Sequence, residues 1–254
     1  LKLYAKRLNP VVARDEGMFL EMDVIVAMKD IQEDAFKHDA AVKGDVGAMA
    51  EYLWTSNKKF SICNDMELCS VLNAVIRDDV AEEIEAAIVI CRSINSRRIR
   101  RSNVEADINI QSYPPTGETW RGGGFRSQHR AFFEGMIGKK YRVPGFLATS
   151  TKRSIAAKFA FDAFEEDSSH PYVIWRVRVD PRGKLHPEHR VKHMTFVSKT
   201  LVEGEEEYLF APYSVFTLVS AEWSDSLSKP HEFTVQAARD NKMEDENVPL
   251  TPWY

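Results

Sequence analysis

Cysteine is scarce in this chain of 254 residues, which contains only Cys63, Cys69 and Cys91. Three cysteines leave one unpaired in any disulfide scheme, and no CxxC pair or Cys/His spacing indicates zinc. The sequence therefore excludes a disulfide framework and predicts no metal site. It is typical of reduced thiols in a cytoplasmic fold.

Long apolar runs and a surplus of basic charge are also missing. No run approaches the roughly 18–20 apolar residues that cross a bilayer, so we predict no membrane span. The formal net charge of -4 argues against a generic nucleic-acid binder, because neutralising phosphates requires a basic face. We interpret the local cluster of Arg97, Arg98, Arg100 and Arg101 as a solvated helix end or loop, with a phosphate or partner site as the alternative.

The first part of the chain has apolar residues at helical spacing. We expect helices at residues 13–41, 49–54, 64–76 and 78–94. Asp78 and Asp79 suit a helix start, because aspartate oxygens accept the free backbone N–H groups there. The prolines at 114 and 115 cannot continue a helix, so the sequence predicts a helical lobe over residues 1–112.

The rest of the chain, residues 113–254, has the pattern of an α+β lobe. Val173, Trp175, Val177 and Val179 alternate with Ile174, Arg176 and Arg178, as a half-buried strand requires. We expect further strands at residues 194–197, 208–210 and 215–219, and a helix at residues 154–164. We expect the tail from residue 242 to lie on the surface, docked through Trp253 and Tyr254.

A first candidate for chemistry is Trp120-Arg121-Gly122-Gly123-Gly124-Phe125, which places a guanidinium beside three glycines. Glycine lets a ligand approach the backbone, and arginine can bind phosphate or carboxylate oxygens through two N–H groups. The alternative is a flexible turn with an exposed arginine, which the segment alone favours. It is not a Rossmann fingerprint, since the glycine spacing and the strand-to-helix context are missing.

A second candidate lies at residues 144–151, where an apolar strand ends in Thr149, Ser150 and Thr151 before an alanine-rich helix. Threonine and serine are good helix N-caps, so capping and ligand contact both remain open here.

A third candidate is the run Glu205-Glu206-Glu207, which leads into an apolar strand. Strand alternation would put Glu205 and Glu207 on one face and turn Glu206 away. Two carboxylates on one face repel each other unless a cationic group or developing positive charge lies before them. A solvated acidic edge that prevents strand pairing is the alternative.

In this order the three segments resemble the mono-ADP-ribosyltransferases of the Arg–Ser–Glu class, which includes clostridial binary toxins and vertebrate arginine-specific ecto-enzymes. The family pattern is an aromatic-Arg-Gly strand, then Phe-x-Ser-Thr-Ser before a helix with Ala-x-x-Phe-Ala character, then Glu-x-Glu entering a strand. The counterparts here are residues 120–122, 146–150 with 156–160, and 205–212. The match covers about residues 113–225 and departs at Ala148, where the family has its first serine; a register over residues 149–151 restores the hydroxyls but shortens the link to the helix.

The resemblance implies an α+β fold in which an N-terminal helical lobe precedes an ADP-ribosyltransferase-like split β-sandwich. It implies NAD as substrate, without a metal. Arg121 would contact the NAD phosphates, and the Gly122 backbone would hold the nicotinamide carboxamide. Thr149 and Ser150 would steady the nicotinamide ribose and the catalytic glutamate.

In the same resemblance Glu207 would bind the ribose 2′-OH and stabilise an oxocarbenium-like transition state. Glu205 would orient an attacking guanidinium. An aromatic residue of the helix would stack on nicotinamide, for which Phe159 is the first candidate and Phe161 and Phe164 are others. Packing in the core is the alternative for all three phenylalanines.

The sequence thus predicts an NAD-dependent mono-ADP-ribosyltransferase that modifies a protein side chain, arginine in the first instance. Two alternatives stay open: an NAD glycohydrolase of the same fold, and a catalytically inactive binding module, which Ala148 would explain. The expected partner is a protein acceptor, with no nucleic acid and no membrane, and the oligomeric state is left open. The expected site of action is the cytoplasm, either for an endogenous enzyme or for a delivered effector.

Overall fold

The structure is a computed structural model that describes residues 17–60, 63–96, 113–180, 190–200 and 204–252. The chain forms two compact units. One comprises Leu1–Arg97 together with Val197–Glu203, and the other comprises Arg98–Phe196 together with Gly204–Tyr254. The basic cluster at residues 97–101 and the aromatic pair Trp253 and Tyr254 lie outside the described residues.

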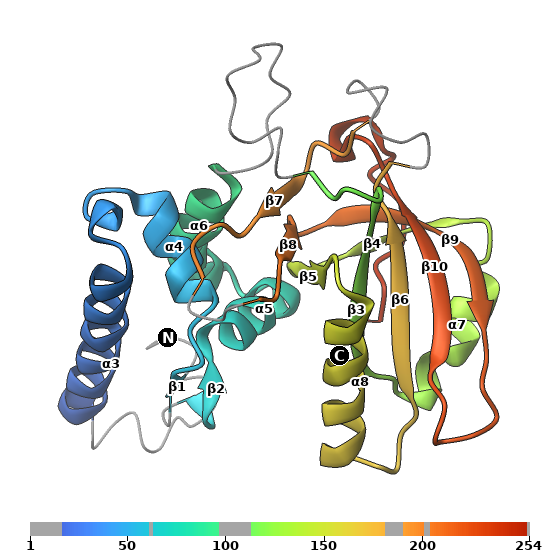
Figure 1. Cartoon of the computed structure of the whole chain (residues 1–254), viewed down its shortest axis with the longest axis horizontal. Helices are drawn as coiled ribbons and strands as arrows, with labels where there is room; N and C mark the ends of the chain where they lie inside the picture. Colours follow the sequence, from blue (N-terminus) through green and yellow to red (C-terminus); the bar gives the residue numbers. More distant parts are fainter. Residues whose placement is uncertain (1–16, 61–62, 97–112, 181–189, 201–203, 253–254) are drawn as a thin grey trace. The chain divides into compact units, whose positions relative to one another are not determined.

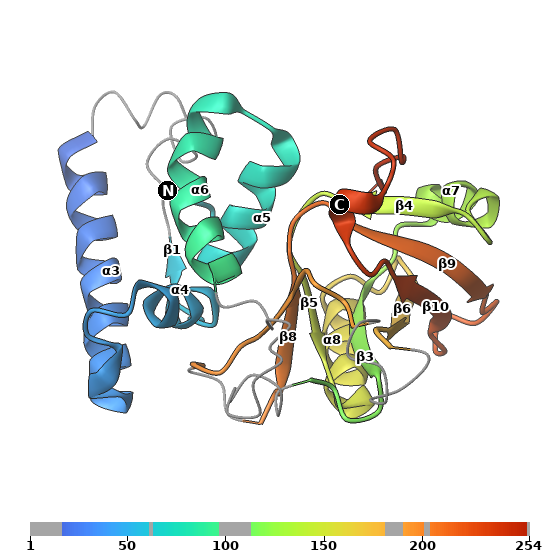
Figure 2. The same ribbon diagram turned by 90° about the horizontal axis from the view of Figure 1, so that it is seen from above.

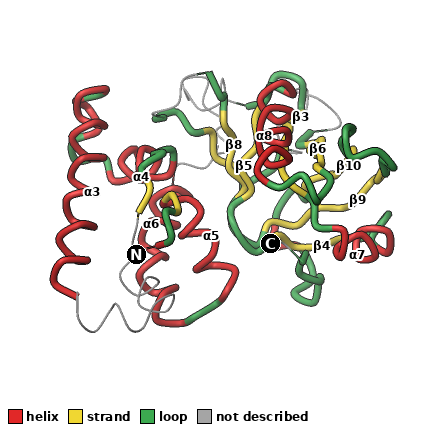
Figure 3. Tube along the Cα trace, turned by 90° about the horizontal axis from the view of Figure 1, so that it is seen from below, coloured by secondary structure: helices red, strands yellow, loops and turns green. Residues whose placement is uncertain are grey.

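The first unit is built mainly of helices, which Figure 3 shows in red. Helix α4 packs against α3, α5 and α6, and a two-stranded ribbon lies between α4 and α5 in the chain. Asp45 caps α4, because its side chain accepts from the Ala48 N–H at 2.9 Å. The elements are α3 (Gly17–His38), α4 (Val46–Trp54), β1 (Lys59–Phe60), β2 (Met66–Glu67), α5 (Leu68–Asp78) and α6 (Ala81–Ser96). The expected N-terminal helices are therefore confirmed.

Two helix starts were predicted wrongly. Asp79 does not begin α6: it ends α5 in the left-handed conformation, with φ of 52°, and its N–H bonds the Val75 carbonyl at 3.2 Å. Asn64 and Asp65 also have positive φ, and α5 begins after Glu67. Aspartate and asparagine suit both a helix N-terminus and the left-handed position, so their presence alone does not tell a start from a stop.

A buried carboxylate in the first unit binds the chain that follows β7 (Met194–Phe196). The Glu51 side chain is fully buried, and its Oε2 accepts from the Lys199 N–H at 2.9 Å and from the Ser198 hydroxyl at 3.2 Å. The Lys199 ammonium in turn pairs with Asp39. These bonds compensate the cost of burying the Glu51 carboxyl group, and they explain why the segment after β7 belongs to the helical unit.

The second unit is a mixed sheet of eight strands with helices α7 (Arg130–Gly135) and α8 (Arg153–Glu166), as Figure 1 shows. The spatial order is β4-β9-β10-β6-β3-β5-β8-β7. β10 pairs with β6 in parallel, and the other described pairs are antiparallel. The further strands are β3 (Glu118–Gly124), β4 (Lys140–Val143), β5 (Leu147–Ser150), β6 (Tyr172–Arg178), β8 (Glu207–Phe210), β9 (Ser214–Glu222) and β10 (His231–Ala237). Helices followed by this sheet confirm the expected α+β class.

The sheet is nearly divided between β3 and β5 (Figure 2). β3 pairs with β6 along all of Glu118–Gly124, but in the described strands it pairs with β5 at one position, where Trp120 lies opposite Ser150. One hydrophobic core takes side chains from both strand groups, including Trp175 and Phe233 from one and Tyr208 from the other. The two groups are thus the halves of a β-sandwich that is split between β3 and β5, and we call this junction the split.

Strand β6 has the two faces that its alternation predicts. Val173, Trp175, Val177 and Val179 are buried in the core between the two strand groups. Ile174 on the other face is buried as well, because α8 packs on that side of β3 and β6.

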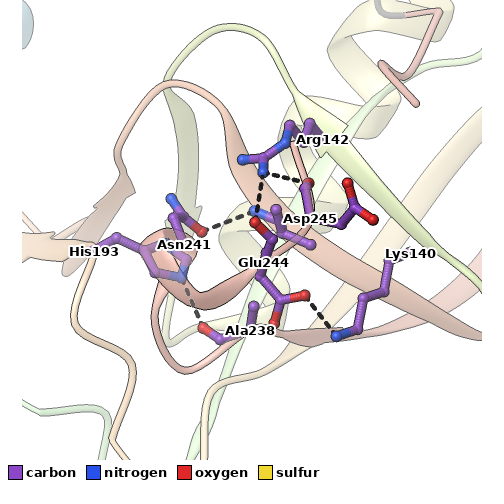
Figure 4. Close-up of polar contacts among 8 residues, drawn as sticks. Lys140, Arg142, His193, Ala238, Asn241, Glu244 and Asp245 are labelled. Carbon is purple, nitrogen blue, oxygen red and sulfur yellow. Dashed lines mark hydrogen bonds and ion pairs between the residues drawn. The ribbon is translucent and has the colours of Figure 1, made fainter. Parts of the chain in front are cut away.

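The C-terminal segment after β10 covers the outer strand β4 (Figure 4). The Arg142 guanidinium donates to the backbone carbonyls of Tyr213 at 3.2 Å, Asp245 at 2.8 Å and Glu244 at 3.5 Å. Lys140 pairs with the Glu244 carboxylate at 2.5 Å. The backbone of Arg142 is paired with the same segment: its N–H donates to the Pro249 carbonyl and its carbonyl accepts from the Thr251 N–H, both at 2.8 Å, so the edge of β4 is covered there.

Candidate functional site

The three candidate segments meet at the split. Arg121 lies in β3, Ser150 ends β5 and Glu207 begins β8. Ser150 lies directly opposite Trp120 on one side and directly opposite Glu207 on the other. Residues about 30 and 60 positions apart in sequence are therefore neighbours on three adjacent strands.

The Arg121 side chain reaches across the split. Arg121 lies opposite Trp175, whose side chain is in the core, so alternation places the arginine on the core side of β3. Its Nη1 donates to the Ala148 carbonyl of β5 at 3.0 Å. The arginine is thus held to the neighbouring strand through a backbone oxygen.

Gly122 is needed for helix packing. A Cβ at this position would lie 1.7 Å from the Ala156 carbonyl oxygen and 2.8 Å from the Ala160 nitrogen, both in α8. The close approach that the glycine permits is therefore the approach of a helix backbone to the strand. The role of its own backbone toward a ligand stays a prediction.

The hydroxyl run at the end of β5 does not cap α8. The N-cap residue of α8 is Lys152, and it makes no side-chain cap hydrogen bond. Thr149 instead donates to the Tyr208 carbonyl at 3.0 Å, and Ser150 donates to the Glu205 carbonyl at 2.5 Å. The two hydroxyls therefore tie β5 to the segment that carries the glutamates.

The strand alternation expected for the three glutamates is wrong, because Glu205 and Glu206 are not part of a strand. The strand begins only at Glu207, and Glu206 has φ of 47° after Gly204 with φ of 82°, so Glu205 and Glu206 lie in a turn. The Glu206 carboxylate accepts from the Thr151 hydroxyl and pairs with Lys152 at 3.0 Å. Both contacts hold the pKa of Glu206 below its usual value, the Thr151 hydrogen bond most strongly.

Glu207 and Arg121 leave their strands on different sides. Tyr208 is a core residue, so alternation directs its neighbour Glu207 away from the core, whereas Arg121 leaves β3 on the core side. The two strands carrying them flank β5, which β3 meets at Trp120 in the described sheet. A single ligand can therefore contact both side chains only where it passes around the split.

Two of the three candidate phenylalanines of α8 are exposed, whereas Phe164 is half-buried and lies against the Tyr172 ring, with ring centroids 5.4 Å apart. Phe159 is 48% exposed and Phe161 is 49% exposed, because the buried face of α8 consists of Ala156 and Ala160. α8 covers the Gly122 face of β3, which is the side opposite Arg121. The structure does not bring Phe159 together with Arg121.

Lys152 was not singled out from the sequence. Its ammonium donates to the Gly204 carbonyl at 2.8 Å besides pairing with Glu206. The available signal was a lysine that directly follows the hydroxyl run, in a chain that has an acidic run further on.

Within the described ranges, no group of three or more His, Cys, Asp or Glu side chains could hold a metal ion. No helix in the described part of the chain is long and apolar enough to cross a membrane.

No family model matches the chain, and no curated protein matches its sequence. The chain is similar in structure to bacterial proteins that include ADP-ribosyltransferases. The Vis toxin, an ADP-ribosyltransferase from Vibrio splendidus, is 17% identical, with a TM-score of 0.46 and with 87% of this chain and 88% of that chain covered. ADP-ribosyltransferase HopU1 of Pseudomonas syringae is 15% identical, with a TM-score of 0.49 and 76% of each chain covered. Exoenzyme S from Pseudomonas aeruginosa, solved with human 14-3-3 protein beta and carba-NAD, is 14% identical, with a TM-score of 0.48 and with 87% of this chain and 95% of that chain covered.

Proposed function

We propose that this chain transfers ADP-ribose from NAD to a protein side chain, arginine, and releases nicotinamide. The supporting observation is the register at the split, where Ser150 lies opposite Glu207 and beside the strand that carries Arg121. Arg121 and Glu207 thus lie on the two strands that flank β5, which supports their proposed roles as phosphate anchor and catalytic carboxylate. We place the site of action in the cytoplasm.

The chemistry needs a fixed negative charge near the nicotinamide ribose. Breaking the bond between the anomeric carbon and nicotinamide develops positive charge on the sugar. A carboxylate that faces this carbon stabilises the transition state more than the bound substrate, which lowers the barrier. Glu207 is our catalytic carboxylate, because it is half-buried at the start of a strand and lies opposite Ser150.

The remaining roles follow from charge and position. The Arg121 guanidinium has the planar donor geometry that binds phosphate oxygens, and NAD carries two phosphates. Glu205 lies two residues before the catalytic carboxylate, in a turn, and an acidic side chain there would orient a cationic acceptor. The dinucleotide would lie around the split, with its phosphates at residue 121 and its nicotinamide ribose at residue 207.

The test measures transfer and NAD hydrolysis separately in purified protein, with polyarginine as acceptor. We expect Glu207→Gln to lower both rates by about 100-fold or more, as removal of a transition-state contact does. Glu205→Gln should reduce transfer more than hydrolysis. Glu165→Gln on α8, where the glutamate is exposed, is the matched control and should resemble the wild type. Full transfer activity in Glu207→Gln would rule the proposal out.

A catalytically inactive binding module is a second candidate, and Ala148 is the observation that favours it. The resemblance predicts a hydroxyl at this position, and alanine has none. Calorimetry distinguishes the candidates, because an inactive module without NAD affinity shows no heat of binding. If NAD is bound and hydrolysed while mass spectrometry finds no ADP-ribose on the acceptor, the chain is an NAD glycohydrolase.

A further inference from the structure

Three consecutive residues at the junction of β5 and α8 hold the turn that carries the glutamates. Ser150 donates to the Glu205 carbonyl at 2.5 Å, and Thr151 donates to the Glu206 carboxylate. The Lys152 ammonium donates to the Gly204 carbonyl at 2.8 Å and pairs with Glu206 at 3.0 Å. We call Thr151, Lys152 and Glu206 the Glu206 clamp.

The clamp grips the turn on both sides of Glu205. Gly204 and Glu206 both have left-handed backbone conformations, with φ of 82° and 47°. This region is disfavoured for glutamate, so the surrounding contacts must maintain it. Lys152 binds the residue before Glu205 and the residue after it, so this ammonium supports the position of Glu205 together with the Ser150 and Thr151 hydroxyls.

The clamp also divides the three glutamates by role. The Glu206 carboxylate points at Thr151 and Lys152, and the pKa of Glu206 is lowered by these two contacts. Glu206 is therefore ionised at neutral pH and its charge is compensated locally. Glu205 and Glu207 flank it on the chain.

We infer that Glu206 is a positioning residue, which acts with Thr151 and Lys152 to hold Glu205 in the place from which it orients the acceptor. This inference rests on the proposed function. In transfer and in hydrolysis alike, the bond from the anomeric carbon to nicotinamide breaks. A new bond forms to a guanidine nitrogen or to a water oxygen, and that atom loses one proton. Transfer needs an oriented acceptor, whereas hydrolysis needs only water, so a loosened turn shifts the products toward free ADP-ribose.

The first experiment measures the ratio of transfer to hydrolysis at a fixed acceptor concentration. Lys152→Met and Glu206→Gln each break the ion pair, and Lys158→Met and Glu165→Gln on the exposed side of α8 are their controls. An exposed ion pair changes a local equilibrium by about two- to fivefold, so we expect the ratio to fall by that factor through a higher KM for the acceptor. Thr151→Val should lower the ratio and Thr151→Ser should restore it. An unchanged ratio in both ion-pair variants would overturn the positioning role.

The second experiment tests the clamp without NAD. Hydrogen exchange of the peptide covering residues 204–210 is compared between wild type, Lys152→Met and Lys158→Met, none of which alters that peptide. We expect exchange about two- to fivefold faster in Lys152→Met alone, and a smaller difference at high salt. Equal exchange in all three proteins would overturn the clamp itself. If the wild type neither transfers nor hydrolyses, the proposed function and the positioning role fail together, while the exchange rates still report whether the turn is clamped.

Discussion

Replacing Gly122 with alanine tests how closely α8 packs on β3. The added Cβ would lie 1.7 Å from a carbonyl oxygen, where an ordinary contact is 3.4 Å or more. The nearest atoms belong to the backbone of α8, so no side-chain rotation relieves the overlap. The helix must retreat by more than an ångström and lose the packing of its alanine face. Overpacking of this kind costs about 1–3 kcal/mol and sometimes more, and we expect the upper end, about 3 kcal/mol of unfolding free energy for the second unit.

Urea and thermal unfolding, followed by tryptophan fluorescence and circular dichroism, measure this effect. A loss of about 3 kcal/mol lowers the melting temperature of a unit of this size by about 6–12 °C. Gly124→Ala is the matched control, because it lies on the same face of β3 and its Cβ would meet only the Ala163 Cβ at 3.8 Å. We expect that control to change stability by less than about 1 kcal/mol. If the two variants unfold together, the close approach of α8 is wrong.

Three further predictions concern other parts of the structure. Arg142→Ala removes a donor to three backbone carbonyls, so limited proteolysis of the C-terminal segment should be severalfold faster. Arg142→Lys should restore only part of the protection, since lysine lacks the planar donor geometry of a guanidinium. Equal cleavage of all three proteins would contradict the assignment. His231 is buried, and its Nδ1 accepts from the Ser224 N–H at 2.9 Å. Burial lowers the pKa of His231 below the value of 6.5 that it has in the unfolded chain. The free energy of unfolding is therefore full above pH 6.5 and falls as the pH drops toward the pKa of the folded state. Urea midpoints between pH 7 and pH 5 should show this step in the wild type and not in His231→Asn. Glu51→Leu leaves the part-buried Lys199 N–H without its acceptor and should destabilise the helical unit by about 1–3 kcal/mol, whereas Glu51→Gln keeps an oxygen there and should cost less in the same urea titration.

The fold was predictable where the pattern is local. In strand β6 the residues that face the core, Val173, Trp175 and Val177, were predicted one by one from their alternate positions. Strand β10 also alternates in burial, yet it was not predicted, because the mixed polarity of residues 231–237 forms a strand only between β6 and β9. The boundary between α5 and α6 was misplaced at Asp79, since a short acidic side chain fits both ends of a helix.

The site was predictable in its order along the chain and not in its register. The segments with Arg121, Ser150 and Glu207 stood out by composition, but the alignment of Ser150 opposite both Trp120 and Glu207 depends on pairing between distant strands. The direction of Glu206 depends on a left-handed backbone that no alternation predicts. Phe159 is exposed because the packed face of α8 is formed by Ala156 and Ala160 and not by its phenylalanines.

The chain crosses between its two units more than once, and this restricts how the protein can be cut or recombined. It enters the helical unit again after Phe196 and returns at Gly204, immediately before the glutamates. A fragment that starts at residue 113 would keep Ser198 and Lys199 but discard Glu51, which binds both. Shuffling of the helical unit between related proteins, in the laboratory or in evolution, therefore has to replace the excursion at Val197–Glu203 along with the first 97 residues.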